Sequence, residues 1–166
     1  MKKILNTIST VLVAIVVGLV LVMYGPKLVG YEPLMVLSGS MEPTYHVGSL
    51  VYVGKTDPTD LKEGDVITFS INDQTLVTHR IIEVNQEEQW VRTKGDANVN
   101  EDGGTTSFTK IKGVVKFSIP FLGYLAAYLA TKSGMIMAVT VVIVILLLSV
   151  LPDMLFKESE GEDSEK

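Results

Sequence analysis

The chain has 166 residues, of which 47% are hydrophobic, and its mean hydropathy of +0.35 indicates that part of it is not exposed to water. The net charge of −5 argues against a nucleic-acid partner, because binding to phosphates requires a basic surface. The absence of cysteine excludes a disulfide framework and cysteine-based zinc or thiol chemistry, and two histidines, His46 and His79, are too few for a three-histidine metal site.

The first predicted element is a membrane-spanning helix. Residues 4–26 form an uncharged run of 23 positions after Lys2 and Lys3, and about 20 helical residues suffice to cross the hydrocarbon core of a bilayer. A cleavable signal peptide has a shorter apolar region, of about 7 to 15 residues, and "LVMYGPKLVG" contains no Ala-x-Ala-like cleavage site. We therefore expect residues 1–26 to be an uncleaved transmembrane anchor.

Residues 27–118 have the pattern of a folded β domain. Short stretches rich in β-branched residues alternate with turn sequences such as "GKTDPTDLKEG" and "INDQ", and no helical periodicity separates them. Strands that follow one another in this way typically form antiparallel sheets. The predicted fold class is mainly β, a small antiparallel barrel or sandwich between two transmembrane helices. The expected strands are 49–53, 65–71, 76–84, 89–93 and 110–117.

Three further segments complete the chain. Residues 119–132 are too short to span a bilayer and are predicted to be interfacial, although they can also extend a helical hairpin. Residues 133–153 begin with an uncharged run of 20 positions and are predicted to be a second transmembrane helix. The acidic residues 154–166 are expected to form a solvated, disordered tail.

The predicted topology follows from the positive charges at the N-terminus. Lys2 and Lys3 favour a cytoplasmic N-terminus, which places the β domain on the extracytoplasmic face of the plasma membrane and returns the acidic tail to the cytoplasm. Lys27 and Lys132 weaken this signal because they flank the spans on the outer side.

The stretch "VLSGSMEPT" contains two serines, Ser38 and Ser40, in a turn sequence. A serine becomes a nucleophile when a neighbouring base takes its proton. Alternation along the predicted strand "TLVTHRIIEV" places His79 on the face of Val77 and Ile81, which is typical of a core histidine as well as of a positioned base. His46 lies in a polar turn and is expected at the surface.

Lysines and acidic residues leave further alternatives open. Lys55, Lys62 and Lys94 are candidate bases for a Ser-Lys pair, but their charged, turn-like surroundings favour solvated side chains. Asp96 in "KGDAN" and Asp102 in "NEDGG" are both candidates for the group that orients a catalytic histidine, and both are also typical loop residues.

Three blocks of the sequence resemble the motifs of type I signal peptidases: "SGSMEPT", the strand-borne "HR" and "TKGDANVNED". The resemblance extends over residues 33–123. The histidine is similar to that of the endoplasmic-reticulum-type branch, found in archaea, eukaryotes and some Gram-positive bacteria, in which histidine replaces the lysine base of the usual bacterial enzymes. The chain departs from many bacterial signal peptidases in having no large inserted second domain and in its second predicted span, and both features fit this branch.

The resemblance implies catalytic roles for three residues and supporting roles for two more. Ser40 matches the nucleophile, His79 the general base, and Asp102 the carboxylate that orients the histidine. Ser38 matches a hydroxyl that helps the backbone N–H of Ser40 to hold the oxyanion, and Asp96 matches a second acidic position with a supporting role. No metal and no organic cofactor are expected.

The resemblance also implies a function. We expect a membrane-bound serine endopeptidase, a signal peptidase I, that cleaves signal peptides from exported precursors after small residues through an acyl-enzyme. Its partners would be these signal peptides, the lipid bilayer and an accessory subunit that the sequence does not identify. Two alternatives stay open: a membrane-tethered β module that binds a partner without catalysis, and a self-cleaving serine protease of the same fold.

Overall fold

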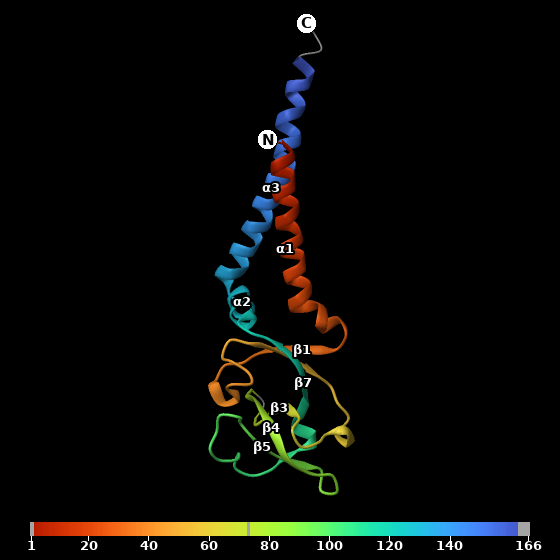
Figure 1. Cartoon of the computed structure of the whole chain (residues 1–166), viewed down its shortest axis with the longest axis vertical. Helices are drawn as coiled ribbons and strands as arrows, with labels where there is room; N and C mark the ends of the chain where they lie inside the picture. Colours follow the sequence, from red (N-terminus) through yellow and green to blue (C-terminus); the bar gives the residue numbers. More distant parts are fainter. Residues whose placement is uncertain (1, 73, 163–166) are drawn as a thin grey trace. The chain divides into compact units, whose positions relative to one another are not determined.

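The computed structural model of the chain describes residues 2–72 and 74–162 and divides into two compact units. One unit is built from the two ends of the chain, Met1–Val22 and Tyr128–Lys166, and the other is the continuous segment Met23–Ala127. The first is helical, and the second contains all the strands in the described part of the chain (Figure 1).

Two long helices have the length and composition needed to cross a membrane. Helix α1 covers Lys2–Leu28 and α3 covers Lys132–Glu162. Their apolar parts, each long enough to cross a bilayer, are Asn6–Leu28 and Lys132–Val150. Both predicted transmembrane segments are therefore helical in the structure, and the two helices are compatible with a membrane protein.

Helix α3 continues beyond the predicted end of the second span. Residues 154–162 were expected to be disordered, but they are helical as far as Glu162. A helix that is already formed adds residues without a new nucleation step, and Met, Leu, Lys and Glu in this stretch are strong helix formers. Composition alone therefore underestimated the length of the helix. The last part of the predicted tail, residues 163–166, lies outside the described residues.

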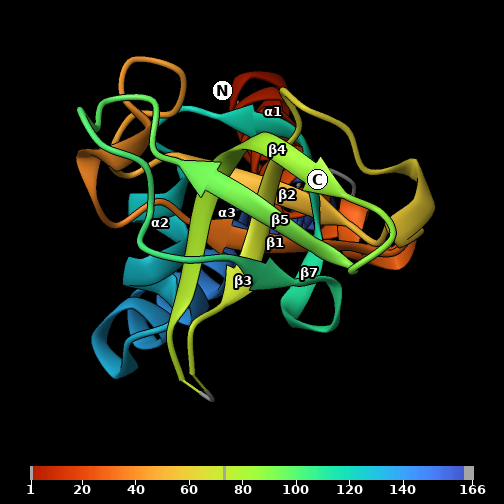
Figure 2. The same ribbon diagram turned by 90° about the horizontal axis from the view of Figure 1, so that it is seen from below.

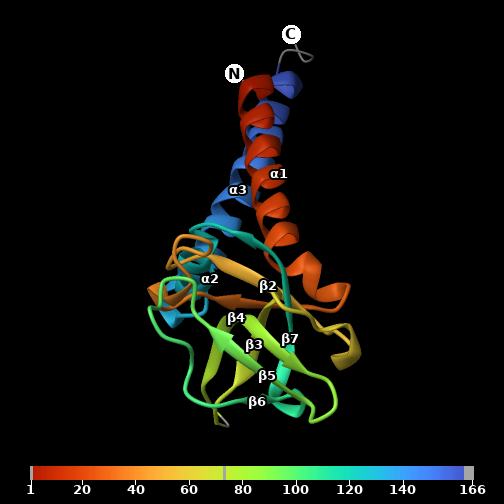
Figure 3. The same ribbon diagram turned by 60° about the horizontal axis from the view of Figure 1, so that its bottom comes forward.

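The second unit is a seven-stranded antiparallel sheet with the order β1-β2-β7-β3-β4-β5-β6. This confirms the mainly β fold class, as an open sheet that curls part of the way towards a barrel (Figure 3). The strands are β1 Tyr31–Met35, β2 Leu50–Gly54, β3 Val66–Ser70, β4 Leu76–Asn85, β5 Trp90–Lys94, β6 Thr106–Ser107 and β7 Ile111–Ile119.

Strand β7 joins the two halves of the curled sheet. Its first part pairs with β3 and its second part pairs with β2, with a register shift in each ladder. A register shift of this kind bends a strand and increases its twist. Figure 3 shows β7 running from the layer of β3, β4 and β5 to that of β1 and β2.

The five predicted strands are all present, and the two that sequence reasoning missed are the two edges of the sheet. Strand β1 contains Glu32 and Pro33, and its only partner in the described chain is β2. Proline is tolerated at an edge because its missing N–H faces away from the ladder, so the strand signal was weak. Strand β6 has only two residues and carries no periodicity to recognise.

Two clusters of buried side chains form the core of the sheet unit. One contains Ile67, Ile81 and Val91 of the neighbouring strands β3, β4 and β5. The other contains Val51, Val53 and Val115 together with Met41. Met41 comes directly after Ser40 and is only 2% exposed. The second cluster therefore holds the predicted nucleophile's turn against the sheet.

Helix α2 occupies Leu122–Leu129, within the segment predicted to be interfacial. Its Gly123 is buried, and the backbone N–H of Gly123 donates to the carbonyl of Gly48 at 2.9 Å. The start of this helix is thus attached to the turn that precedes β2. An interfacial role for residues 119–132 stays a prediction.

Candidate active site

The two candidate serines lie on a short turn after β1. Gly39–Met41 form one turn of 3₁₀ helix, with Ser38 in an extended conformation just before it. The hydroxyl oxygens of Ser38 and Ser40 lie 3.4 Å apart. Ser40 is half-buried and Ser38 is exposed, so both hydroxyls can be reached from outside. The turn projects them side by side while the buried Met41 anchors it.

His79 lies in β4 on the face that it shares with the core residue Ile81, as the alternation predicted. Its Nδ1 atom is 2.6 Å from Oδ2 of Asp102. A carboxylate only accepts hydrogen bonds, so Nδ1 carries the proton in this pair and Nε2 is left as an acceptor. His79 is only 7% exposed. The histidine is thus both a buried residue and one oriented like a general base.

Asp96 makes different contacts from Asp102. The guanidinium of Arg80 donates to both of its carboxylate oxygens, at 2.8 and 2.7 Å, and Thr44 Oγ1 donates to Oδ2 at 2.5 Å. The hydrogen bonds from Arg80 hold the pKa of Asp96 below its ordinary value; burial opposes this, and Thr44 adds to it. The same bonds raise the pKa of Arg80.

These contacts give Asp96 a bracing position between two parts of the site. Thr44 belongs to the serine turn sequence, and Arg80 follows His79 in β4. Since one carboxylate binds both, it links the segment of the predicted nucleophile to the strand of the predicted base. The supporting role that the resemblance implied for Asp96 stays a prediction.

The backbone of the loop after β5 also contacts the serine turn. The N–H of Ala97 donates to the carbonyl oxygen of Ser40 at 2.9 Å. Gly95 approaches the same carbonyl so closely that a Cβ atom at this position would lie 2.6 Å from it. Figure 2 shows this loop leaving the sheet after β5 as a wide green curve. One loop therefore carries both aspartates and contacts Ser40.

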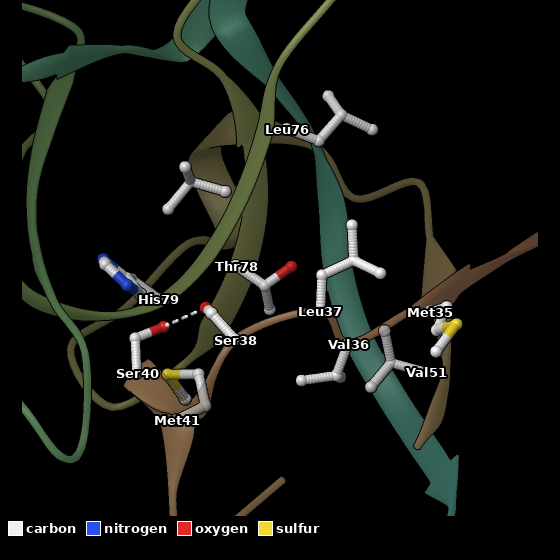
Figure 4. A pocket seen from close by; sticks show the side chains of 11 residues that line it. Met35, Val36, Leu37, Ser38, Ser40, Met41, Val51, Leu76, Thr78 and His79 are labelled. Atoms are coloured by element: carbon white, nitrogen blue, oxygen red, sulfur yellow. Dashed lines mark hydrogen bonds between the residues drawn. The ribbon is translucent and has the colours of Figure 1, made fainter. Parts of the chain in front are cut away.

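The serines and the histidine line one pocket, of about 260 Å³. In Figure 4, Ser38, Ser40 and His79 gather at one end, and apolar side chains extend from there towards Met35. In the described chain no hydrogen bond joins Ser40 to His79; the Ser40 hydroxyl contacts that of Ser38 instead. Bonds between nucleophile and base are often long before substrate binds, so the shared pocket is the relevant feature.

The edge of β4 beside this pocket is unpaired. β4 pairs with β3 over Leu76–Arg80, but its pairing with β5 begins only at Arg80. Among the described residues no strand occupies the other side of the segment from Leu76 to His79. An exposed edge of this kind can accept an extended peptide as an added strand.

The other candidate bases do not line this pocket. Lys55, Lys62 and Lys94 are not among the residues that line the pocket. His46 is exposed, its Nδ1 atom lies 2.5 Å from Oε2 of Glu42, and it is not among the residues that line the pocket. Of the candidates raised by the sequence, the geometry brings Ser38, Ser40 and His79 to one pocket and Asp102 to His79.

Sequence reasoning missed three residues that organise this site: Thr44, Arg80 and Thr93. Thr93 Oγ1 donates to Asp102 Oδ2 at 2.7 Å. Thr93 had a recognisable signal in the sequence. It follows Val91 by two residues and so shares its inward face of β5, where an apolar residue is expected. The partners of Thr44 and Arg80 lie 52 and 16 residues away and had no local signal.

Comparison with known proteins agrees with this geometry. Residues 5–99 match the family model described as signal peptidase, peptidase S26. The matched range includes both serines, His79 and Asp96 and ends before Asp102, so the position of Asp102 rests on the structure.

Named relatives belong to the same group of proteins. Signal peptidase I W of Bacillus subtilis is 36% identical over 122 residues, which cover 68% of this chain and 64% of that protein. The signal peptidase complex catalytic subunits SEC11 of Candida dubliniensis and Lodderomyces elongisporus are 32% and 34% identical over 102 residues, covering 55% of this chain and 61% of each relative. The aligned part thus spans less than two thirds of these relatives. With more than half of its residues matched to the family model, the chain belongs to the signal peptidase family, peptidase S26.

Proposed function

We propose that the protein is a membrane-bound serine endopeptidase that removes signal peptides from exported precursor proteins. Ser40 is the nucleophile, His79 the general base and Asp102 the group that orients the histidine. The observation that carries the proposal is the short contact between His79 and Asp102, next to a pocket that also contains the Ser40 hydroxyl.

The mechanism follows from these positions. Nε2 of His79 accepts the proton of Ser40 as Oγ attacks the scissile carbonyl carbon, and Asp102 stabilises the imidazolium through Nδ1. The backbone N–H of Ser40 and the hydroxyl of Ser38 donate to the oxyanion, and each such donor is worth about 3 to 4 kcal/mol in related sites. The imidazolium then protonates the leaving amine, which leaves an ester between Ser40 and the signal peptide.

Hydrolysis of this ester completes the cycle. His79 takes a proton from a water molecule, the resulting hydroxide attacks the ester carbon, and Ser40 recovers its proton as the peptide acid leaves. The protein side chains supply every proton transfer in this scheme. The mechanism therefore requires no metal and no organic cofactor.

The substrate is an extended peptide with small side chains before the cut. The unpaired edge from Leu76 to His79 supplies main-chain hydrogen-bonding groups, and the pocket beside it is lined by Val36, Met41 and Val51. The resemblance to signal peptidases implies Ala-sized side chains at the first and third positions before the scissile bond, and these apolar walls can accommodate them. A signal peptide provides such residues next to its apolar helix.

The cellular location is a further part of the proposal. The two apolar helices support two membrane spans, and the N-terminal lysines support a cytoplasmic N-terminus with the sheet unit on the extracytoplasmic face of the plasma membrane. Exposed Phe121 and Tyr124 support an interfacial role for residues 119–132, because aromatic rings favour the headgroup level. Two relatives are named as catalytic subunits of a signal peptidase complex. These names support the expectation that this protein also has an accessory subunit.

The decisive experiment reconstitutes the full chain in lipid vesicles with a labelled precursor. Wild type should cut the precursor after a small residue, identified by mass spectrometry, and Ser40→Ala should leave it intact while keeping its circular dichroism spectrum. Intact precursor with both proteins, bound equally well, would instead indicate a binding module. Cleavage of the chain itself with no cut in the precursor would indicate a self-cleaving protease.

A further inference from the structure

Thr93 is a polar residue in an apolar position of β5. Its side chain points inward, as that of Val91 does two residues earlier, and it is only 1% exposed. Its Cα partner in the sheet is Ile81 of β4, a member of the buried core. A hydroxyl costs free energy when it is buried without a hydrogen bond. The group that the Thr93 hydroxyl binds therefore indicates the role of this residue.

That partner is Asp102, which Thr93 holds at two points. The Thr93 hydroxyl donates to Asp102 Oδ2 at 2.7 Å, and the Thr93 carbonyl oxygen accepts from the Asp102 backbone N–H at 2.9 Å. The same Oδ2 atom lies 2.6 Å from Nδ1 of His79. One carboxylate oxygen therefore accepts from the threonine and from the histidine together.

A second attachment lies on the outer face of the same strand. Arg92 precedes Thr93, and Glu101 precedes Asp102. The Nη1 atom of Arg92 lies 3.4 Å from Oε2 of Glu101, and both side chains are about half exposed. A pair of this kind contributes little on its own because water screens it. The buried contacts of Thr93 are therefore the main restraint on Asp102.

The restraint is needed because Asp102 lies in a loop. Between β5 and β6 the chain has no regular secondary structure, and the side chain of Asp102 is 27% exposed, so water can compete for its oxygens. The Thr93 side chain is buried in β5, so its hydroxyl has few accessible directions. This hydroxyl can hold Oδ2 towards Nδ1 of His79 and keep Nε2 free for the proton of Ser40.

We propose that Thr93 is a positioning residue of the active site, which sets the orientation of the Asp102 carboxylate and, through it, the tautomer and direction of His79. The inference rests on the proposed peptidase function and assigns a fourth residue to its proton-transfer unit. It predicts that the hydroxyl of Thr93, rather than its bulk, is what catalysis requires.

The kinetic test compares Thr93→Val with Thr93→Ser in the full chain reconstituted in lipid. Thr93→Val keeps the shape of the side chain and removes the hydroxyl. The loss of one hydrogen bond to a charged group should lower kcat about tenfold to a hundredfold, with little change in KM. Thr93→Ser keeps the hydroxyl and should recover most of kcat. Unchanged kcat in Thr93→Val, or equal losses in both variants, would overturn the proposal.

A matched control separates this effect from the general cost of losing a buried hydroxyl. Thr68 is fully buried in β3, and its hydroxyl contacts that of Thr78 at 2.8 Å rather than Asp102. Thr68→Val should lower the thermal unfolding midpoint to a similar extent and change kcat much less than Thr93→Val does. Equal kcat losses in Thr68→Val and Thr93→Val would assign the effect to folding and overturn the proposal.

A spectroscopic readout makes failure of this inference distinguishable from failure of the proposed function. A proton in a short Nδ1–H···O bond resonates at unusually low field in proton NMR, and observing it requires no substrate. With Ser40→Ala as the common background, the His79 signal should persist in Thr93→Ser and vanish or broaden in Thr93→Val. An unchanged signal in Thr93→Val would overturn the positioning role, whereas absence of precursor cleavage by wild type would overturn only the function.

Discussion

His79 Nδ1 lies 2.6 Å from Asp102 Oδ2, although 23 residues separate the two in the chain. β4 supplies the histidine and the loop after β5 supplies the aspartate, so their contact depends on the pairing of these two strands. Asp96, only six residues before Asp102 in the sequence, binds Arg80 instead. The two aspartates of one loop thus have different partners, and the consequence of this difference can be measured.

Asp102→Asn should impair catalysis far more than Asp96→Asn. An amide at position 102 can donate to Nδ1 and favour the tautomer with its proton on Nε2, and the corresponding change in serine proteases costs about 10⁴-fold in kcat. Asp96→Asn should mainly lower stability, because Asp96 braces Thr44 and Arg80. Single-turnover cleavage in vesicles and thermal unfolding of the same samples test both. Equal activity of the two variants would remove Asp102 from the mechanism.

The pH dependence of cleavage should identify the base. His79 accepts the proton of Ser40 in the proposed mechanism, so cleavage should require its imidazole. Lys94→Met should leave the profile unchanged, since Lys94 does not line the pocket. His79→Ala should abolish cleavage at every pH. A profile that Lys94→Met alters while His79→Ala still cleaves would show that a lysine is the base.

The Arg80–Asp96 pair should make stability depend on pH. Its hydrogen bonds lower the pKa of Asp96 in the folded chain, so the stabilisation is fully present above about pH 4, the ordinary range for aspartate, and is lost as the pH falls through the lowered pKa. The Arg80 side chain is 34% exposed, so solvent screening reduces the contribution to about 1 to 2 kcal/mol.

Urea unfolding of the detergent-solubilised chain from pH 6 to pH 3 measures this effect. Asp96→Asn should lower the unfolding free energy at pH 6 and flatten its decline towards pH 3, and Arg80→Gln should flatten it in the same way. The same slope in wild type and in both variants would show that other carboxylates cause the acid sensitivity.

Gly95→Ala should displace the nucleophile. A methyl group at this position would lie 2.6 Å from the carbonyl oxygen of Ser40, so either the serine turn or the loop must move. A shift of about 1 Å in a reacting group can reduce the rate about a hundredfold. Gly103→Ala is the control in the same loop, because a Cβ atom there meets nothing within 4 Å. Comparable cleavage by both variants would contradict the close approach of Gly95 to Ser40.

Local patterns in the sequence were sufficient for much of the architecture. Apolar runs of sufficient length predicted both long helices, and β-branched stretches bounded by turn sequences predicted five strands. Alternation predicted the face on which His79 lies. These predictions succeeded because hydrophobicity and its period act over a few neighbouring residues. β1 was not predicted because Pro33 weakens the strand signal, although an edge strand tolerates proline. β6 was not predicted because two residues are too few to show a periodic pattern.

The sequence by itself determined which groups are available: two serines around a glycine, a histidine on an apolar strand face and two aspartates in one loop. Only the tertiary structure decided that Asp102 rather than Asp96 meets His79, that Arg80 and Thr44 hold Asp96, and that Thr93 reaches Asp102. The path of an irregular loop depends on contacts with residues distant in the chain. Spacing alone therefore cannot show which carboxylate faces the histidine.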